Sequence, residues 1–174
     1  MEKKDKILAT ALALFAKEGY TATSTAKIAK EAGVSEGLIF RHYENKKGLL
    51  DAIMSACDIR LERVLMHILD EEDPQQVICK AISLPFVNMD NEEEVAYWKL
   101  QFKLKWDQEY NNPEKMKPLL QKLSWAFRRL GNPNPDQEAA LVSHITESIS
   151  TEILRGNLTD PASYQAFLLE KYNC

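Results

Sequence analysis

Basic side chains between residues 41 and 47 are the ones whose types and spacing best suit a definite chemistry. The guanidinium of Arg41 is a planar fork of donors that can pair with a phosphate or with the two acceptors of a guanine edge. Lys46 and Lys47 follow Asn45, a residue that caps helix starts well. The helix dipole disfavours cations in a first turn, but a phosphate bound there would reverse the sign. The pattern therefore predicts a base contact for Arg41 and phosphate contacts for both lysines.

Residues that could hold a metal or perform catalysis form no comparable pattern. His144 and Glu147 are three positions apart, but no second His-carboxylate pair accompanies them, and His67 has no partner in the sequence. The chain also has no glycine-rich phosphate loop and no nucleophile elbow. We therefore expect no metal, no cofactor and no enzymatic activity.

The three cysteines, Cys57, Cys79 and Cys174, are widely spaced and leave one unpaired in any disulfide scheme. They fit a reducing cytoplasm, in which we expect Cys57 and Cys79 to be small core residues. The charged start of the chain does not resemble a signal peptide, and no apolar stretch approaches twenty residues. The sequence predicts a cytoplasmic protein without a membrane span.

The net charge of −4 hides an asymmetry along the chain. Residues 1–50 carry nine Lys/Arg and six Asp/Glu, a net +3, whereas residues 51–174 carry thirteen and twenty, a net −7. A basic head on an acidic body suits a protein that touches phosphates at one end only.

The elements that must position these residues are helices throughout, and the periodicity and the capping residues predict nine of them. Their expected ranges are 3–18, 25–32, 36–42, 46–69, 74–87, 92–110, 113–131, 136–154 and 161–172. Residues 98–106 alternate apolar and polar as a half-buried strand would. We predict a helix there, because no other strand is available as a partner.

Residues 24–43 predict a helix-turn-helix. Ser24 or Thr25 can cap the first short helix, and Gly33 supplies the positive φ of a tight turn. Ser35 can cap the second helix, and Val34 can fill the angle between the two. Such a unit places its second helix in the DNA major groove.

The segment from about Lys6 to Leu50 resembles the TetR/AcrR family of transcriptional regulators. The resemblance rests on a set of residues in the family's order: Ile28-Ala29, Ala32-Gly33-Val34-Ser35, Phe40-Arg41-His42-Tyr43, Lys46 and Leu49-Leu50. Leu38 and Phe40 depart from the hydroxyl-bearing residues common in the family, so base reading falls mainly on Arg41. Leu38 can instead touch a thymine methyl or simply pack.

The resemblance implies an all-α fold with a three-helix DNA-binding head, residues 1–47, and a helical body, residues 48–174, that dimerises and senses an effector. It implies a repressor that binds a pseudo-palindromic operator as a homodimer and that a small apolar or aromatic effector releases. The predicted DNA contacts are Ser24, Thr25, Lys27, Ser35, Glu36, Leu38, Phe40, Arg41, His42, Tyr43, Lys46 and Lys47.

Two residue sets in the body carry the remaining expectations. Aromatic side chains cluster on the sixth and seventh predicted helices and could line an effector cavity, although plain core packing would use the same spacing. The predicted effector contacts are Tyr97, Trp98, Phe102, Trp106, Tyr110 and Trp125. An apolar seam on the last two helices predicts a dimer surface, with intramolecular packing as the alternative: Leu141, Ile145, Ile149, Ile153, Tyr164, Phe167 and Leu168.

Two alternatives stay open at this stage. The body could bind a protein partner or serve as an architectural module without an effector, and close-packed aromatics would favour this. The chain could also be a helical enzyme or carrier that has kept the head as a relic, but no catalytic grouping supports it.

Overall fold

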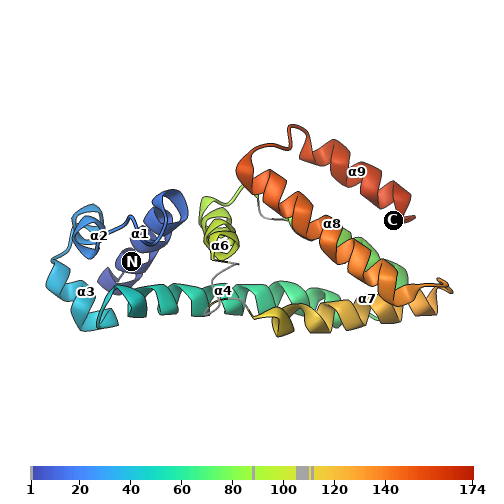
Figure 1. Ribbon diagram of the computed structural model, residues 1–174, viewed down its shortest axis with the longest axis horizontal. Helices are drawn as coiled ribbons and strands as arrows, with labels where there is room; N and C mark the ends of the chain where they lie inside the picture. The colour runs from blue at the N-terminus through green and yellow to red at the C-terminus, as the bar shows by residue number, and fades with distance from the viewer. Residues whose placement is uncertain (1, 88, 105–109, 111) are drawn as a thin grey trace. The chain divides into compact units, whose positions relative to one another are not determined.

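The computed structural model describes residues 2–87, 89–104, 110 and 112–174, and within them every regular element is helical (Figure 1). The elements, in chain order, are α1 (Lys3–Glu18), α2 (Thr25–Ala32), α3 (Glu36–Tyr43), α4 (Lys46–Leu69), α5 (Pro74–Ser83), the 3₁₀ helix η1 (Leu84–Phe86), α6 (Glu92–Lys103), the 3₁₀ helix η2 (Pro113–Met116), α7 (Lys117–Arg129), α8 (Pro135–Arg155) and α9 (Pro161–Lys171). The predicted all-α class and the nine α-helices are confirmed for the described residues.

Helix boundaries follow local capping chemistry. The side chains of Ser24, Asp73, Asn91 and Asp160 each accept a hydrogen bond from a backbone N–H in the first turn that follows them. The helix predicted over residues 74–87 instead ends at Ser83 and continues as η1, because Pro85 cannot donate the backbone bond that an α-helix needs.

The segment with strand-like alternation is helical as far as Lys103, where α6 ends. Its continuation to residue 110 cannot be compared, because residues 105–109 lie outside the described part of the chain. The helix predicted from residue 113 begins as η2 and becomes α-helical at Lys117.

The chain forms two compact units, and the first comprises Met1–Arg60 and Met89–Asn111. Its core is formed by α1, α2, α3, the first part of α4, and α6. The fully buried side chains of this core include Ile7, Phe15, Ile28, Ile39 and Leu100. Packing of α6 on α1 brings this later helix into the unit that holds the helix-turn-helix. The predicted division into a DNA-binding head, residues 1–47, and a body, residues 48–174, concerns function rather than compactness and stays a prediction.

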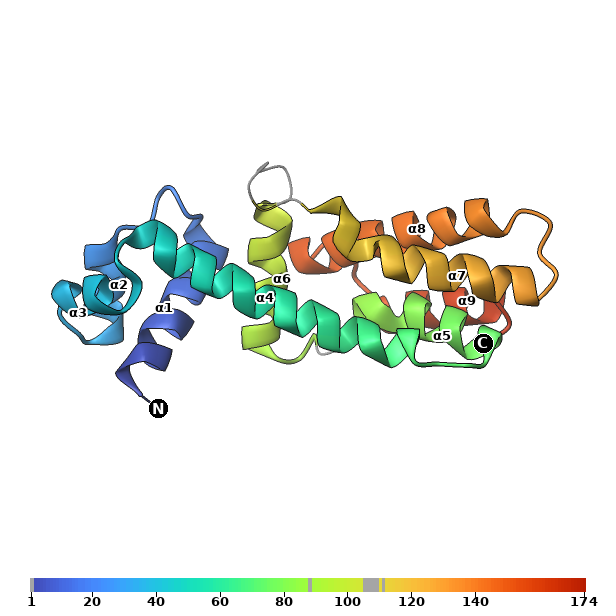
Figure 2. The ribbon, with the colours of Figure 1, turned by 90° about the horizontal axis from the view of Figure 1, so that it is seen from below.

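The second compact unit comprises Leu61–Asn88 and Asn112–Cys174. In it α7 lies alongside α8, and α5 packs against α7, α8 and α9 (Figure 2). Ile78, Ile82, Leu119, Leu123 and Val142 form its buried interior.

One expectation about the cysteines is wrong. Cys79 is half-buried and forms a disulfide with Cys174, with a Cα–Cα distance of 5.5 Å, while Cys57 is buried as expected. The two bonded residues are 95 positions apart, and the return of α9 to α5 brings them together. No local pattern in the sequence indicates that contact.

Within the described residues, no helix combines the length and the apolar character needed to cross a membrane.

Candidate nucleic-acid interface and candidate pocket

The turn between α2 and α3 is built as the sequence predicts. The Ser24 hydroxyl accepts from the Lys27 backbone N–H at 3.1 Å, and Gly33 adopts a left-handed φ of 64°. The N–H of Val34 then bonds the Ala29 carbonyl at 3.0 Å, which closes the end of α2. Ile39 and Tyr43 of α3 face the core and are buried, so Phe40, Arg41 and His42 between them lie on the outward face of the helix.

The outward face of α3 carries much of the predicted DNA-contacting set. Arg41 and His42 are exposed, the Phe40 side chain is 44% exposed, and Leu38 is half-buried. Arg41 has neither an ion-pair nor a hydrogen-bond partner among the described residues, so its guanidinium is available to a ligand. Ser35 occupies the N-cap position of α3, but its hydroxyl makes no capping bond there. The predicted Ser35 cap is thus right in position and wrong in hydrogen bonding.

Tyr43 is placed differently from the exposed α3 residues. Its side chain is 7% exposed and its hydroxyl donates to the Lys4 carbonyl at 3.1 Å. Burial, with a smaller contribution from the Asp5 carboxylate, raises the pKa of this phenol. Tyr43 therefore ties the end of α3 to the start of α1, and its hydroxyl is already used.

Three more of the predicted contact residues bond within the unit. The Thr25 hydroxyl donates to a Glu36 carboxylate oxygen at 2.6 Å, which ties the start of α2 to the start of α3. The Lys27 ammonium lies 2.7 Å from the Glu18 carboxylate. A phosphate approaching these residues would compete with a carboxylate that is already in place.

The two lysines at the start of α4 are held in separate local environments. Asn45 caps the helix by accepting from the Gly48 N–H at 2.9 Å, as predicted. The Lys46 ammonium lies 4.2 Å above the Tyr20 ring, and partial burial lowers the pKa of Lys46. Lys47 pairs with Asp51 at 3.1 Å. Both lysines belong to the first turn of α4, and the start of a helix favours an anion.

A strained turn joins α3 to α4, and sequence reasoning missed it. Glu44 has φ 63° and ψ −47°, and the N–H of Asn45 bonds the Tyr43 carbonyl across it at 2.6 Å. This γ-turn geometry is rare for a residue with a side chain. It fixes the direction in which α4 leaves α3. The sequence signals for a turn, glycine or proline, are absent at this position.

The described aromatic residues of the predicted effector set in the first unit differ in burial. Tyr97 is a core residue, with the Arg60 guanidinium 3.8 Å above its ring, while Trp98 and Phe102 are half-buried. Tyr110 donates its hydroxyl to Asp51 at 2.8 Å. Trp106 lies outside the described residues.

The sixth member of that set, Trp125, lies in the second unit. It is half-buried on α7, with the Lys122 ammonium 4.5 Å from its ring. The predicted effector residues are thus divided between the two units.

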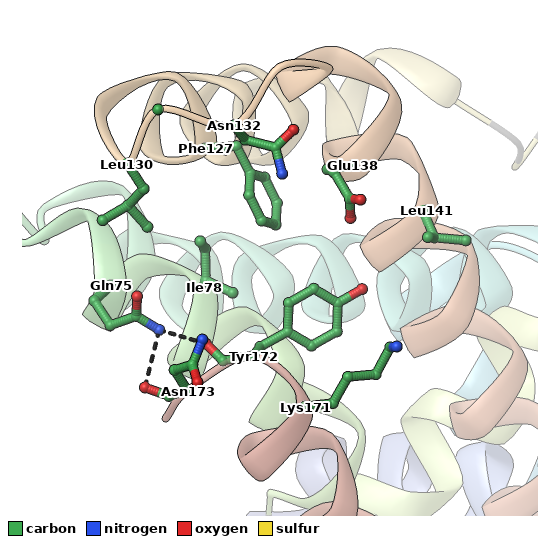
Figure 3. Close-up of a pocket in the computed structure, with 11 residues that line it drawn as sticks. Gln75, Ile78, Phe127, Leu130, Asn132, Glu138, Leu141, Lys171, Tyr172 and Asn173 are labelled. Carbon is green, nitrogen blue, oxygen red and sulfur yellow. Dashed lines mark hydrogen bonds between the residues drawn. The ribbon is translucent and has the colours of Figure 1, made fainter.

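A cavity of about 520 Å³ lies within the second unit (Figure 3). Its walls come from α5, α7, the loop between α7 and α8, α8, and the end of α9 with the segment that follows it, and they combine apolar side chains with a carboxylate, an ammonium and amides. The lining residues are Gln75, Ile78, Phe127, Leu130, Gly131, Asn132, Glu138, Leu141, Lys171, Tyr172 and Asn173. None of them was predicted as an effector contact, because each helix or loop supplies only a few of them and no periodic pattern joins them.

The polar side chains of the cavity surround an aromatic pair. The Phe127 and Tyr172 rings have centroids 6.3 Å apart, and Glu138 is directed into the cavity near Tyr172 in Figure 3. Burial, with the Glu138 charge as a smaller cause, raises the pKa of the Tyr172 phenol. The cavity thus combines two aromatic rings with several polar groups, and small-molecule sites likewise combine apolar surface with polar groups that fix the ligand's orientation.

The predicted dimer residues on α8 and α9 fall into two groups. Leu141, Tyr164 and Phe167 are 46%, 41% and 56% exposed, although all three are large and apolar. Ile149 and Leu168 are buried within the unit, and Ile145 and Ile153 are half-buried. Burial of Ile149 and Leu168 fits the intramolecular packing that the sequence left as the alternative, and the dimer surface stays a prediction.

Residues 7–53 match the family described as bacterial regulatory proteins, tetR family. The chain is 36% identical over 91 residues to the uncharacterized HTH-type transcriptional regulator YerO of Bacillus subtilis, a match covering 49% of this chain and 30% of that protein. It is 30% identical over 63 residues to the biofilm operon negative transcriptional regulator IcaR of Staphylococcus aureus, covering 36% and 34%. The matches thus span about a third of these relatives' length.

Solved structures match the whole chain in fold. NalD, the secondary repressor of the MexAB-OprM multidrug efflux pump of Pseudomonas aeruginosa, superposes with a TM-score of 0.73 at 20% identity, over 98% of this chain and 93% of that one. FadR of Bacillus subtilis, solved with stearoyl-CoA, superposes with a TM-score of 0.69 at 21% identity, over 97% of each chain.

The all-helical fold is that of solved bacterial transcriptional regulators, and the helix-turn-helix lies in the segment that matches the regulators' family model. Within that fold, residues 7–53 match the family model of the tetR regulatory proteins, so the segment with the helix-turn-helix is similar to the DNA-binding part of that family.

Proposed function

We propose that the chain is a repressor that binds a pseudo-palindromic operator as a homodimer and that a small, largely apolar effector releases. The exposed face of α3, on which Arg41 has no partner among the described residues, is the observation that carries the DNA-binding part. In a dimer, the two copies of α3 must enter successive major grooves about 34–36 Å apart.

Substitution of Arg41 is expected to change the sequence preference of DNA binding, whereas substitution of Lys46 is expected to change the affinity for all DNA. Arg41→Ala should relax sequence preference at one base pair, a discrimination of about 1–3 kcal/mol, because a bidentate guanine contact is lost. Lys46→Ala should weaken binding about equally on all sequences and reduce the salt slope by about one, because a phosphate contact is lost. Titration of selected and scrambled duplexes at several salt concentrations measures both effects.

The matched control is Lys117→Ala, which removes an exposed lysine of the second unit that pairs with Glu114. It should leave both affinity and salt slope unchanged. Unaltered binding by the Arg41 and Lys46 variants would contradict the docking of α3 and of the α4 start on DNA.

The three exposed apolar side chains on α8 and α9 support a dimer surface. Tyr164 and Phe167 form an edge-to-face ring pair with centroids 6.1 Å apart, and Leu141 is exposed on α8. Exposed apolar surface that is contiguous often marks a site at which a protein binds a partner. The occupant we propose is the same surface of a second copy.

Phe167→Glu is expected to convert the dimer to a monomer at micromolar concentration, because a charge would be buried at the two-fold contact. Val87→Glu is the control, since Val87 is 45% exposed but lies outside α8 and α9. Sedimentation measurements distinguish the two species. A Phe167→Glu protein that remains dimeric at the same concentration rules out this surface.

For the effector we retain the predicted aromatic set and add the cavity of the second unit as a second candidate site. The cavity is supported by its volume of about 520 Å³ and by the aromatic and polar side chains that line it. FadR of Bacillus subtilis was solved with stearoyl-CoA and a Saccharomonospora viridis regulator with choline, so proteins of this fold hold small molecules.

The two candidate effector sites can be separated by paired substitutions. A panel of fatty acids and aromatic amines is screened for compounds that raise the melting temperature and release DNA. If the aromatic set binds, Trp98→Ala should abolish the shift for the active compound, and if the cavity binds, Tyr172→Ala should abolish it instead. A body without an effector would give no shift with any compound of the panel.

A further inference from the structure

The Cys79–Cys174 disulfide is a chemical group that the proposed function does not use. It joins α5 to the short segment that follows α9, across 95 residues of sequence. Cys174 is exposed and Cys79 is half-buried, so a reagent in solution can reach one sulfur of the bond directly. Cys57 is buried in the other compact unit and lies outside this pair.

Hydrogen bonds around the disulfide attach the same segment to α5. The Gln75 side-chain amide donates to the Tyr172 carbonyl at 2.6 Å and to the Asn173 carbonyl at 3.2 Å (Figure 3). The same nitrogen lies 3.8 Å from each of the two sulfurs. Gln75, Tyr172 and Asn173 all line the cavity, so the disulfide fixes one of its walls.

We propose that Cys79 and Cys174 form a reversible thiol–disulfide site, whose oxidation fixes this cavity wall and the end of α9. The inference rests on the proposed function in one respect: a regulator bound to chromosomal DNA works where thiols are kept reduced. Disulfides in such compartments are usually transient and redox-sensing, whereas permanent ones are rare. An accessible pair at a cavity wall fits the transient kind.

The chemistry balances with a dithiol as reductant and a hydroperoxide as oxidant. A thiolate of the dithiol attacks the exposed Cys174 sulfur, and the Cys79 thiolate leaves and is protonated. The second thiol of the reagent then displaces Cys174, so two electrons pass from the dithiol to the pair. In the reverse direction, the Cys174 thiolate attacks the hydroperoxide, giving a sulfenic acid and an alcohol. Cys79 then displaces water from the sulfenic acid, and the disulfide forms again.

Reduction removes the covalent attachment but leaves the other contacts of α9. Leu168 stays buried against the unit, and the Gln75 bonds remain available. The end of α9 is therefore expected to loosen while the fold persists. Because Tyr164 and Phe167 lie on the same helix, the site also bears on the proposed dimer surface.

The test uses the full chain, oxidised with hydrogen peroxide or reduced with dithiothreitol. Maleimide labelling should add two labels on reduction, at Cys79 and Cys174, while Cys57 reacts only after denaturation. Amide hydrogen exchange in residues 165–174 should accelerate at least tenfold on reduction, and the change should reverse on reoxidation. Cys79→Ser/Cys174→Ser should exchange at the fast rate in both conditions, whereas Cys57→Ala should respond as the wild type does.

A pair that millimolar dithiothreitol reduces only after the protein unfolds would overturn the proposal, as would equal exchange rates in both states. Affinity for a duplex selected from a randomised library is measured separately. Absent DNA binding, with the labelling and exchange responses intact, would contradict the proposed function and leave the thiol site standing.

Discussion

Gly48→Ala is expected to lower the free energy of unfolding by about 1–3 kcal/mol, the usual cost of forcing an extra carbon into a packed site. In most helices this change is favourable by about 1 kcal/mol, because alanine is the better helix former. Here a Cβ would overlap the Tyr43 carbonyl oxygen and lie 3.3 Å from the carbonyl carbon. Both are backbone atoms of the α3–α4 junction, so relief requires the junction itself to move. Urea unfolding, followed by far-UV circular dichroism, measures the loss.

The matched control is Gly37→Ala on α3, where an added Cβ meets nothing within 4 Å. That variant should be more stable than the wild type by about 0.5–1 kcal/mol. The two glycines both lie in helices of the same unit, so opposite signs isolate the effect of the junction. A Gly48→Ala protein as stable as Gly37→Ala would show that the junction can relax.

Reduction of the disulfide is expected to lower the stability of the second unit by about 3–4 kcal/mol. A bond that closes a ring of this length removes chain entropy from the unfolded state, and a ring of about 100 residues corresponds to roughly 4.7 kcal/mol by loop closure alone. The expected value is smaller because measured effects often fall short of that figure. Urea unfolding with and without a dithiol, followed by Trp125 fluorescence in proteins with Trp98 and Trp106 replaced by Phe, measures the difference.

Cys79→Ala should reproduce the reduced midpoint and lose its response to the dithiol. Cys57→Ala is the control and should keep the full response, since Cys57 lies outside the bond. Identical midpoints with and without the dithiol would mean that the disulfide does not change the free energy of unfolding.

Features set by neighbouring residues could be predicted from the sequence. The bounds of α1, α2 and α4 agree with the expected ranges, because apolar periodicity and the capping residues lie within the segments themselves. The left-handed Gly33 and the Ser24 cap follow from the same local chemistry. The exposure of Arg41 follows from the register of α3, once Ile39 is known to face the core.

Contacts between distant segments could not be predicted in this way. Lys103 donates to the Ala16 carbonyl at 2.6 Å and to the Lys17 carbonyl at 3.2 Å, which binds α6 to the last turn of α1. The disulfide and the cavity lining likewise depend on where α9 and α5 meet. Each of these needs the tertiary arrangement, on which the spacing of residues within one segment carries no information.

The aromatic cluster shows how one pattern supports two outcomes. Tyr97 became a core residue beneath Arg60, whereas Trp98, the next residue, is half-buried. Helical spacing tells which side chains share a face, but not which neighbour covers that face. The effector assignment for this set therefore stays a prediction. The cavity of the second unit was not predicted from the sequence.

The carboxylates that hold Lys27 and Lys47 have a consequence for how such a protein would search a genome. Glu18 and Asp51 occupy these ammonium groups at 2.7 Å and 3.1 Å. On the proposed function, a DNA phosphate that approaches Lys27 or Lys47 competes with these carboxylates, whatever the base sequence. This competition lowers the affinity for all DNA sites equally and so shortens residence on random DNA. At the operator, base contacts compensate for the lost affinity. The Glu18 and Asp51 carboxylates thereby favour rapid movement along DNA over long residence at non-operator sites.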